Sequence, residues 1–238
     1  MVLLGMLLLL VVEAGDADAL TWENDHTVGT SANNWEQVDS DGDDTYVGYV
    51  KLSGFIPSAY ARHYDGTTWG IESPVTGRVF RSDQIKLAVE DGIAHVVYVD
   101  KSGTDDNVYY ATFSGTFWAN VSLVSNQAAG ASASQPSISV SDGVAHVVWT
   151  EDVDGDYDIY YRSFDGQYWS TTGKVNLDAQ NENQEYGDVY ADGDNIHFAW
   201  VDDRRGDADI FYRSYDGRTW GTVTEVSEDD TSEAQTSP

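Results

Sequence analysis

The chain has 238 residues, of which 41 are Asp or Glu and 12 are Lys or Arg, so its formal net charge is −29. This excess of negative charge argues against nucleic acid and anionic lipid as partners, because both would be repelled. Cysteine is absent, which excludes a disulfide framework and any zinc site built on thiolates.

The chain starts with an apolar run over residues 1–12, followed by small and acidic residues. Such a run is too short to span a bilayer but fits the hydrophobic part of a secretory signal, with Ala17-Asp18-Ala19 as a small-x-small cleavage site. We therefore expect residues 1–19 to be a signal peptide or anchor segment, and the protein to be secreted or displayed at the cell surface without further membrane contact. A buried hydrophobic strand is the alternative, since no Lys or Arg precedes Lys51.

An internal repeat follows. His95, His146 and His197 are 51 residues apart, and so are Trp118, Trp169 and Trp220, while Trp69 leads Trp118 by 49. Repetition at this period is typical of arrays of equivalent structural units. Four units stand in register, at residues 36–84, 85–135, 136–186 and 187–237.

Each unit contains four short runs of strand-forming residues, which are clearest in the third unit. There the runs "PSISVSDG", "VAHVVWTED", "YDIYYRSFDG" and "YWSTTGKVNL" are rich in Val, Ile, Tyr and Trp, and Asp-Gly turns close two of them. No segment shows a sustained helical period. Four strands per unit at this period predict an all-β fold, a β-propeller built from four-stranded antiparallel blades. A β-sandwich with a duplicated motif is the alternative.

The two ends of the chain look like parts of further blades. Residues 20–35 resemble the outer strand of a preceding blade, and the tail "SEAQTSP" resembles "SASQPS" at residues 132–137. We therefore expect an N-terminal orphan strand, four complete blades and a fragment of a larger propeller, with a closed four-bladed ring as the alternative.

The turn that precedes each repeated Trp carries a family resemblance. The segments "RHYDGTTW", "RSFDGQYW" and "RSYDGRTW" resemble the Asp-box, or BNR, repeat of sialidase-like propellers, Ser-x-Asp-x-Gly-x-x-Trp. Each is one residue shorter between Asp and Trp, and the second unit has Ser114 in place of the Asp.

We interpret these boxes as structural. Gly accepts the positive φ of a tight turn, the Asp side chain can accept hydrogen bonds from turn amides, and the Trp can pack across the hairpin and between blades. In the resembling family the box lies away from the active centre. The residues concerned are Asp65, Gly66, Trp69, Asp165, Gly166, Trp169, Asp216, Gly217 and Trp220.

The resemblance also implies how a sialidase would work, with three arginines gripping a carboxylate, a Tyr nucleophile with a Glu partner and an Asp acid/base. Arg62, Arg162 and Arg213 occupy one equivalent position in three units, whereas catalytic residues need unlike roles, so we expect a repeated structural ion pair or a solvated face there. No catalytic residue is assigned. Arg204 and Arg205 break the repeat and are candidate ligand-binding residues.

Two acidic loops raise the question of a metal. Carboxylates at this density suit Ca²⁺, but the glycine placement does not match an EF-hand, so we favour a solvated acidic turn, with weak Ca²⁺ binding as the alternative. No other cofactor is indicated. The candidate ligands are Asp152, Asp154, Asp156 and Asp158 in the third unit and Asp207 and Asp209 in the fourth.

The repeated histidines are not a ligand cluster, because they occur once per blade. We expect them to be structural and hydrogen-bonded to a neighbouring blade, with a ring of imidazoles facing the channel as the alternative.

Together these features predict an extracellular propeller module that recognises a glycan or a surface protein without catalysis, since aromatic and acidic residues suit sugars. One alternative is an exo-sialidase-like glycoside hydrolase whose active centre lies partly outside this chain. Another is a structural repeat module of a larger surface protein.

Overall fold

The structure is a computed structural model that describes residues 36–125, 130–153, 155–177, 182–204 and 208–227. The expected signal segment at 1–19 and the orphan strand at 20–35 lie outside these residues. Within them the only helical element is a 3-10 turn, η1 (Val75–Gly77). No helix in the described part is long and apolar enough to cross a membrane.

The described residues form four antiparallel sheets of four strands each, in the order of the chain. Blade 1 holds β1 (Gln37–Asp41), β2 (Asp44–Ser53), β3 (Ile56–Tyr64) and β4 (Ser73–Pro74). Blade 2 holds β5 (Ile85–Glu90), β6 (Ile93–Asp100), β7 (Asn107–Phe113) and β8 (Trp118–Leu123). Blade 3 holds β9 (Ala133–Ser141), β10 (Val144–Asp152), β11 (Tyr157–Phe164) and β12 (Gly173–Lys174). Blade 4 holds β13 (Gln184–Asp192), β14 (Asn195–Asp202), β15 (Asp209–Tyr215) and β16 (Thr224–Glu225).

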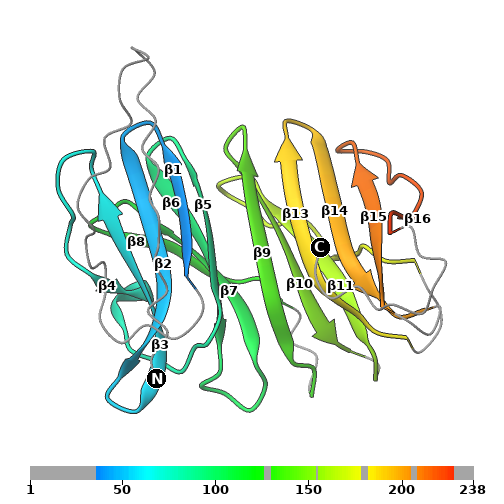
Figure 1. The fold of residues 1–238 in the computed structure, drawn as a ribbon, viewed down its shortest axis with the longest axis horizontal. Coiled ribbons are helices and arrows are strands. Elements are labelled where there is room, and N and C mark those ends of the chain that lie inside the picture. Colours follow the sequence, from blue (N-terminus) through cyan, green and yellow to red (C-terminus); the bar gives the residue numbers. More distant parts are fainter. Residues whose placement is uncertain (1–35, 126–129, 154, 178–181, 205–207, 228–238) are drawn as a thin grey trace.

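The four blades stand side by side in chain order, with blade 1 and blade 4 at opposite ends of the row (Figure 1). The first strands of successive blades contact one another, β1 with β5, β5 with β9 and β9 with β13. This is the blade arrangement of a β-propeller, as the repeat predicted. The described blades do not form the closed four-bladed ring, because blades 1 and 4 do not adjoin.

Two strands begin earlier than the expected unit boundaries at 136 and 187. β9 starts at Ala133 and β13 at Gln184, and each carries a register shift against its partner strand. Gln135 and Tyr186 adopt positive φ at these points. Each of these residues forms a β-bulge, and the strand pairs with its partner strand on both sides of it. The strand therefore continues across the expected unit boundary.

The fourth strand is shorter than the sequence suggested in three of the blades. After the box turn the chain makes one bridge at the Trp and then pairs over two residues only, as in β12. The carbonyl just after the Trp instead accepts a hydrogen bond from an Arg side chain, Arg162 Nε to Ser170 O at 2.9 Å in blade 3. Blade 2 has Ala111 in place of that Arg, and there β8 runs continuously over six residues.

Three apolar cores lie between adjacent blades, one at each junction. They arise because strands two and three of each blade are apolar on both faces, so every inner blade buries both of its surfaces. Val75, Val124 and Val175 come at the ends of blades 1, 2 and 3 and are fully buried in these cores. Val226, their counterpart in blade 4, is 53% exposed.

Side chains in or next to the first strands of blades 2 and 3 also bind the backbone of the next blade. Gln84 Oε1 accepts the amide of Gln135 at 2.5 Å, and Gln135 Oε1 accepts the amide of Tyr186 at 2.9 Å. Ser139 Oγ accepts the amide of Ala191 at 3.0 Å. These bonds fix the position of each blade relative to its neighbour along the direction of the strands.

Candidate functional site

The box turns have the hydrogen bonds expected of a structural motif. The carboxylate of Asp165 accepts the amides of Gln167 and Tyr168 at 2.8 and 2.6 Å, and Asp65 and Asp216 accept the equivalent amides. These amides lower the pKa of all three carboxyls. In blade 2 the Oγ of Ser114 accepts the amide of Phe117 at 3.2 Å. Ser114 therefore takes the place of the Asp but accepts one turn amide instead of two.

In blades 3 and 4 the Trp of the box packs across its hairpin and toward the preceding blade, whereas Trp69 packs within blade 1. Trp169 bridges to Phe164 in the same hairpin, and its indole N–H donates to Ser122 Oγ in blade 2 at 3.0 Å. The conserved geometry extends to Trp118, which donates to Ser73 in blade 1 at 2.9 Å.

The repeated arginines form neither an ion pair nor a solvated face in blades 3 and 4. Arg213 is 6% exposed, its guanidinium lies 4.4 Å from the ring centre of Trp220, and it donates to Gly221 O and to Val175 O in blade 3. Arg162 repeats this arrangement one blade earlier. Each of these two arginines therefore links its blade to the preceding blade. Its partners are carbonyl oxygens and an aromatic ring rather than a carboxylate.

The repeated histidines bond within their own blade, which corrects the expectation of a bond to a neighbouring blade. Nδ1 of His146 lies 2.7 Å from the hydroxyl of Tyr161, and His95 and His197 make the same contact with Tyr110 and Tyr212. The partner is a tyrosine fifteen residues on, because adjacent antiparallel strands bring positions on the same face together.

The two acidic loops join the second and third strands of blades 3 and 4, at the end of the sheets opposite the box turns. In blade 3 the fully buried Glu151 accepts the indole N–H of Trp149 at 2.7 Å, and in blade 4 Asp202 accepts that of Trp200 at 2.9 Å. Arg204, proposed from the sequence as a ligand-binding residue, donates to Asp202 and lies over the ring of Phe211. Arg205 lies outside the described residues.

The predicted calcium ligands are spread over two blades. Asp156 and Asp158 are buried on the β10–β11 hairpin, Asp152 is half-buried there, and Asp209 begins β15. Asp158 binds Lys174 and Asn176, and Asp209 binds Ser227. No group of three metal-binding side chains converges within the described part of the chain, and Asp154 and Asp207 lie outside it.

Calcium binding therefore stays a prediction of the sequence. If Ca²⁺ binds these loops, calcium chloride should raise the Tm of the parent chain above that of an EDTA-treated sample. The D156N variant should show no such rise. An unchanged Tm in the parent chain would leave these loops as solvated acidic turns.

The strongest departure from the repeat lies on β13, the first strand of blade 4. Its four alternate residues are exposed, Tyr186, Asp188, Tyr190 and Asp192. The same positions are Gln84, just before β5, with Lys86, Ala88 and Glu90 in β5, and Gln135, Ser137, Ser139 and Ser141 in β9. We call these four residues of β13 the tyrosine–aspartate stripe.

The stripe continues into a row of rings across blade 4. Tyr190 pairs with His197 on β14, with ring centres 6.4 Å apart, and His197 stacks in turn near Tyr212 on β15. Tyr190 is 64% exposed and Tyr186 is 46% exposed. Asp188 accepts a hydrogen bond from Ser137 of blade 3, which orients one of its carboxylate oxygens. The result is an open aromatic surface edged by carboxylates.

The stripe was not predicted from the sequence. The signal was present, because "EYGDVYAD" places Tyr and Asp where the third unit has "SQPSISVS". Comparing the units position by position at strand one, rather than at the more regular Trp and His positions, would have found it.

A fold of four-stranded antiparallel blades defines a β-propeller, and comparison with solved structures places the chain among such folds. No family model and no curated protein matches the sequence.

Three solved structures illustrate the likeness. The subtype N10 neuraminidase-like protein of A/little yellow-shouldered bat/Guatemala is 14% identical with a TM-score of 0.57, over 84% of this chain and 60% of that one. The Bacteroides ovatus xyloglucan PUL GH43B protein is 16% identical with a TM-score of 0.52, over 88% and 43%. The GH43 endo-arabinanase from Bacillus licheniformis is 11% identical with a TM-score of 0.50, over 79% and 73%. At these identities the likeness concerns the fold, and this chain spans less than two thirds of the first two proteins.

Proposed function

We propose that this chain is a carbohydrate-recognition module that binds sugars at the tyrosine–aspartate stripe and does not cleave them. The observation that carries the proposal is the exposed alternation of tyrosines and aspartates on β13, at positions where the other blades have side chains that join one blade to the next. In blades 2 and 3 these positions face the next blade, whereas on blade 4, the last of the described blades, they stay exposed and could contact a ligand.

The chemistry of the stripe suits a pyranose chain. Aromatic rings offer apolar faces to the C–H face of a sugar, and carboxylates accept hydrogen bonds from its hydroxyl groups. Alternate residues of a strand are about 6.7 Å apart, so Tyr190 stands between Asp188 and Asp192 at roughly the width of one sugar ring. The fold likeness to proteins named as glycoside hydrolases or neuraminidase-like supports a glycan-related role.

We further propose that the module acts outside the cell, on the strength of the apolar run at residues 1–12. Its kinship with Asp-box propellers rests on the box turns, whose Asp carboxylates bind the turn amides as described above.

Two measurements on the full chain separate the candidate functions. A glycan array reports binding, and fluorogenic sialosides, xylosides and arabinosides report cleavage. Saturable binding without turnover supports the proposal. Turnover would select the glycoside hydrolase instead, and silence in both assays would select the structural module.

Removing the rings from the stripe is expected to weaken glycan binding. The Y190A and Y186A variants should each raise the Kd of the best array ligand about tenfold, because each loses a stacking surface. Titration calorimetry with that ligand measures the change.

The matched control is Y168A. Tyr168 is 73% exposed on the box turn of blade 3, so its loss removes a comparable ring that is not on β13. Equal weakening by Y168A and Y190A would place the binding site elsewhere.

A further inference from the structure

A motif for N-linked glycosylation lies on β8, the fourth strand of blade 2. Residues 120–122 read Asn-Val-Ser and match Asn-x-Ser/Thr with x other than Pro, the acceptor pattern of secreted proteins. No other Asn in the sequence is followed two residues later by Ser or Thr. Asn120 stands two residues after the repeated Trp, where the other units have Ile71, Thr171 and Thr222. The motif is therefore a departure of blade 2 from the repeat.

The strand that carries the motif is open to solvent. β8 lies at the edge of its sheet, next to β7. Asn120 is exposed, as are its two neighbours in the chain, and Val121 is 48% exposed. The counterpart of Asn120 in blade 1, Ile71, is 88% exposed. This position of a blade thus faces solvent whether or not it carries an Asn.

A β-bulge presents the side chain of Asn120 outside the regular strand pairing. The register against β7 shifts here, so that Asn120 and Val121 together oppose Ala111. Asn120 has a φ of 53°, in the left-handed region that Asn adopts more readily than most residues. A bulge re-aims the side chain that it carries, and that of Asn120 lies where a modifying enzyme can approach it.

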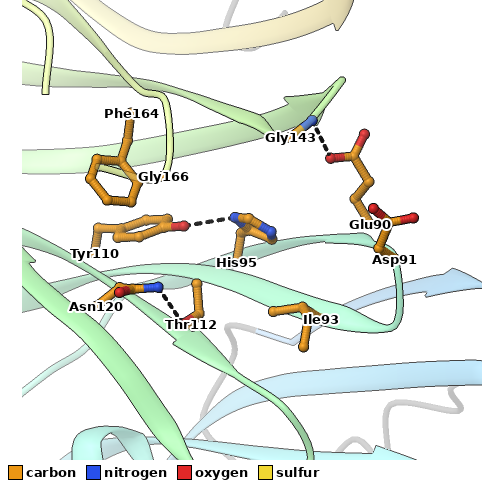
Figure 2. A pocket seen from close by; sticks show the side chains of 10 residues that line it. All are labelled: Glu90, Asp91, Ile93, His95, Tyr110, Thr112, Asn120, Gly143, Phe164 and Gly166. Carbon is orange, nitrogen blue, oxygen red and sulfur yellow. Dashed lines mark hydrogen bonds between the residues drawn. The ribbon is translucent and has the colours of Figure 1, made fainter. Parts of the chain in front are cut away.

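The side-chain amide of Asn120 can be substituted without losing its hydrogen bond. Its Nδ2 donates to Thr112 Oγ1 at 3.1 Å, a bond that Figure 2 shows. An amide NH₂ group has two hydrogens, and a glycosylated amide keeps one of them for this bond. Asn120 also lines a hollow of about 310 Å³ between blades 2 and 3, which leaves room for a first sugar beside it.

The Ser of the motif belongs to the repeat, whereas the Asn does not. Ser122 Oγ accepts the indole N–H of Trp169 at 3.0 Å, and Ser73 receives that of Trp118 in the same way. Blade 1 thus has the Ser without the Asn. Because Trp169 belongs to the following blade, Ser122 receives this bond only once blade 3 has folded against blade 2. Folding proceeds from the N-terminus during synthesis, so the motif is accessible before blade 3 forms.

We propose that Asn120 is an acceptor for N-linked glycosylation when the chain is exported. The donor is an oligosaccharide joined through its anomeric carbon to a lipid phosphate or pyrophosphate. A bond forms between that carbon and Nδ2 of Asn120, the bond from the carbon to the phosphate oxygen breaks, and the amide nitrogen gives up one proton as the lipid phosphate leaves. The proposal rests on the export proposed above and is independent of sugar binding at the stripe.

The test is secretion of the full chain from yeast, once as it stands and once preceded by a leader peptide of the host. Peptide N-glycosidase F in heavy-oxygen water converts a glycosylated Asn to a labelled Asp, which mass spectrometry detects. Label at position 120 is expected in the secreted protein. An unmodified Asn120 in the chain secreted behind the host leader would overturn the proposal. Label in that chain, with no secretion of the chain as it stands, would uphold the site and refute the proposed export.

Three variants locate the glycan. N120Q keeps an amide but breaks the motif, and should lose all of the mass that the glycosidase removes. The matched control is S122T, which keeps the motif and should stay modified. A glycan on N120Q contradicts the proposal. If N120Q is not secreted, S122A takes its place, because it leaves Asn120 unchanged, and equal modification of S122A and S122T would refute the site.

Discussion

Lowering the pH from 7 to 5 is expected to reduce the free energy of unfolding by about 4 kcal/mol through two buried histidines. Burial lowers the pKa of His95 and of His146 from 6.5 to about 4. Between these values the unfolded chain binds protons that the folded chain does not, so stability falls as the pH falls. Each histidine contributes about half of this loss. The box carboxylates do not contribute to it, because pH 5 lies above the range in which they titrate.

Urea unfolding at the two pH values measures this effect. In the H146N variant, whose amide can still meet the hydroxyl of Tyr161, the difference between pH 7 and pH 5 should shrink by about 2 kcal/mol. The Y161F variant is the control, because it loses the hydrogen bond but keeps the buried imidazole. A pH dependence that is the same in H146N as in the parent chain would refute the assignment.

The K174M variant is expected to lower the free energy of unfolding by about 3 kcal/mol. Lys174 pairs with Asp158, whose side chain is fully buried, and Asn176 donates to the same carboxylate oxygen. The other oxygen of Asp158 is buried without a hydrogen-bond partner. Removing the ammonium leaves a buried charge with one neutral donor, and this is why the expected loss is large.

The comparison variant is K101M. Lys101 pairs with Asp83 and Asp106, whose side chains are 43% and 32% exposed, so its loss should cost less than about 1 kcal/mol. Adding D158N to K174M should recover part of the stability, since it removes the buried charge itself. Equal effects of K174M and K101M, measured by urea unfolding, would mean that burial of Asp158 does not govern the pair.

The repeat made the fold predictable, since its period and its Asp-Gly turns need no tertiary information. Asp142 and Gly143 both have positive φ at the β9–β10 turn, as a two-residue hairpin requires. The hydrogen bonds of Asp165 were predictable for the same reason, because donor and acceptor lie within four residues of each other.

The partners of Arg162 and His146 were not predictable in this way. Arg162 bonds to Val124, 38 residues away, and His146 bonds to a tyrosine on the next strand. Both contacts depend on strand register and on how two blades face each other, which the period alone does not specify. The length of the fourth strand depends in turn on that arginine, so the sequence overestimated it.

The stripe was hidden for a related reason. It consists of ordinary residue types and becomes distinctive only when the neighbouring blade is placed beside it. Tyr190 is exposed where Ser139 binds the next blade. A site that arises from differences between repeats needs the contacts of each repeat to be known.

The burial of the repeated valines couples neighbouring blades. Val75, Val124 and Val175 each become core only when the following blade folds against them, whereas Val226 is 53% exposed. Stability in such an array is a sum of intrinsic terms and nearest-neighbour terms. Each interface term is shared by the two blades that form it, so each valine stabilises its own blade and the blade that follows, and Val226 enters no such term among the described residues. A loss at Val75, Val124 or Val175 therefore weakens two adjacent blades together.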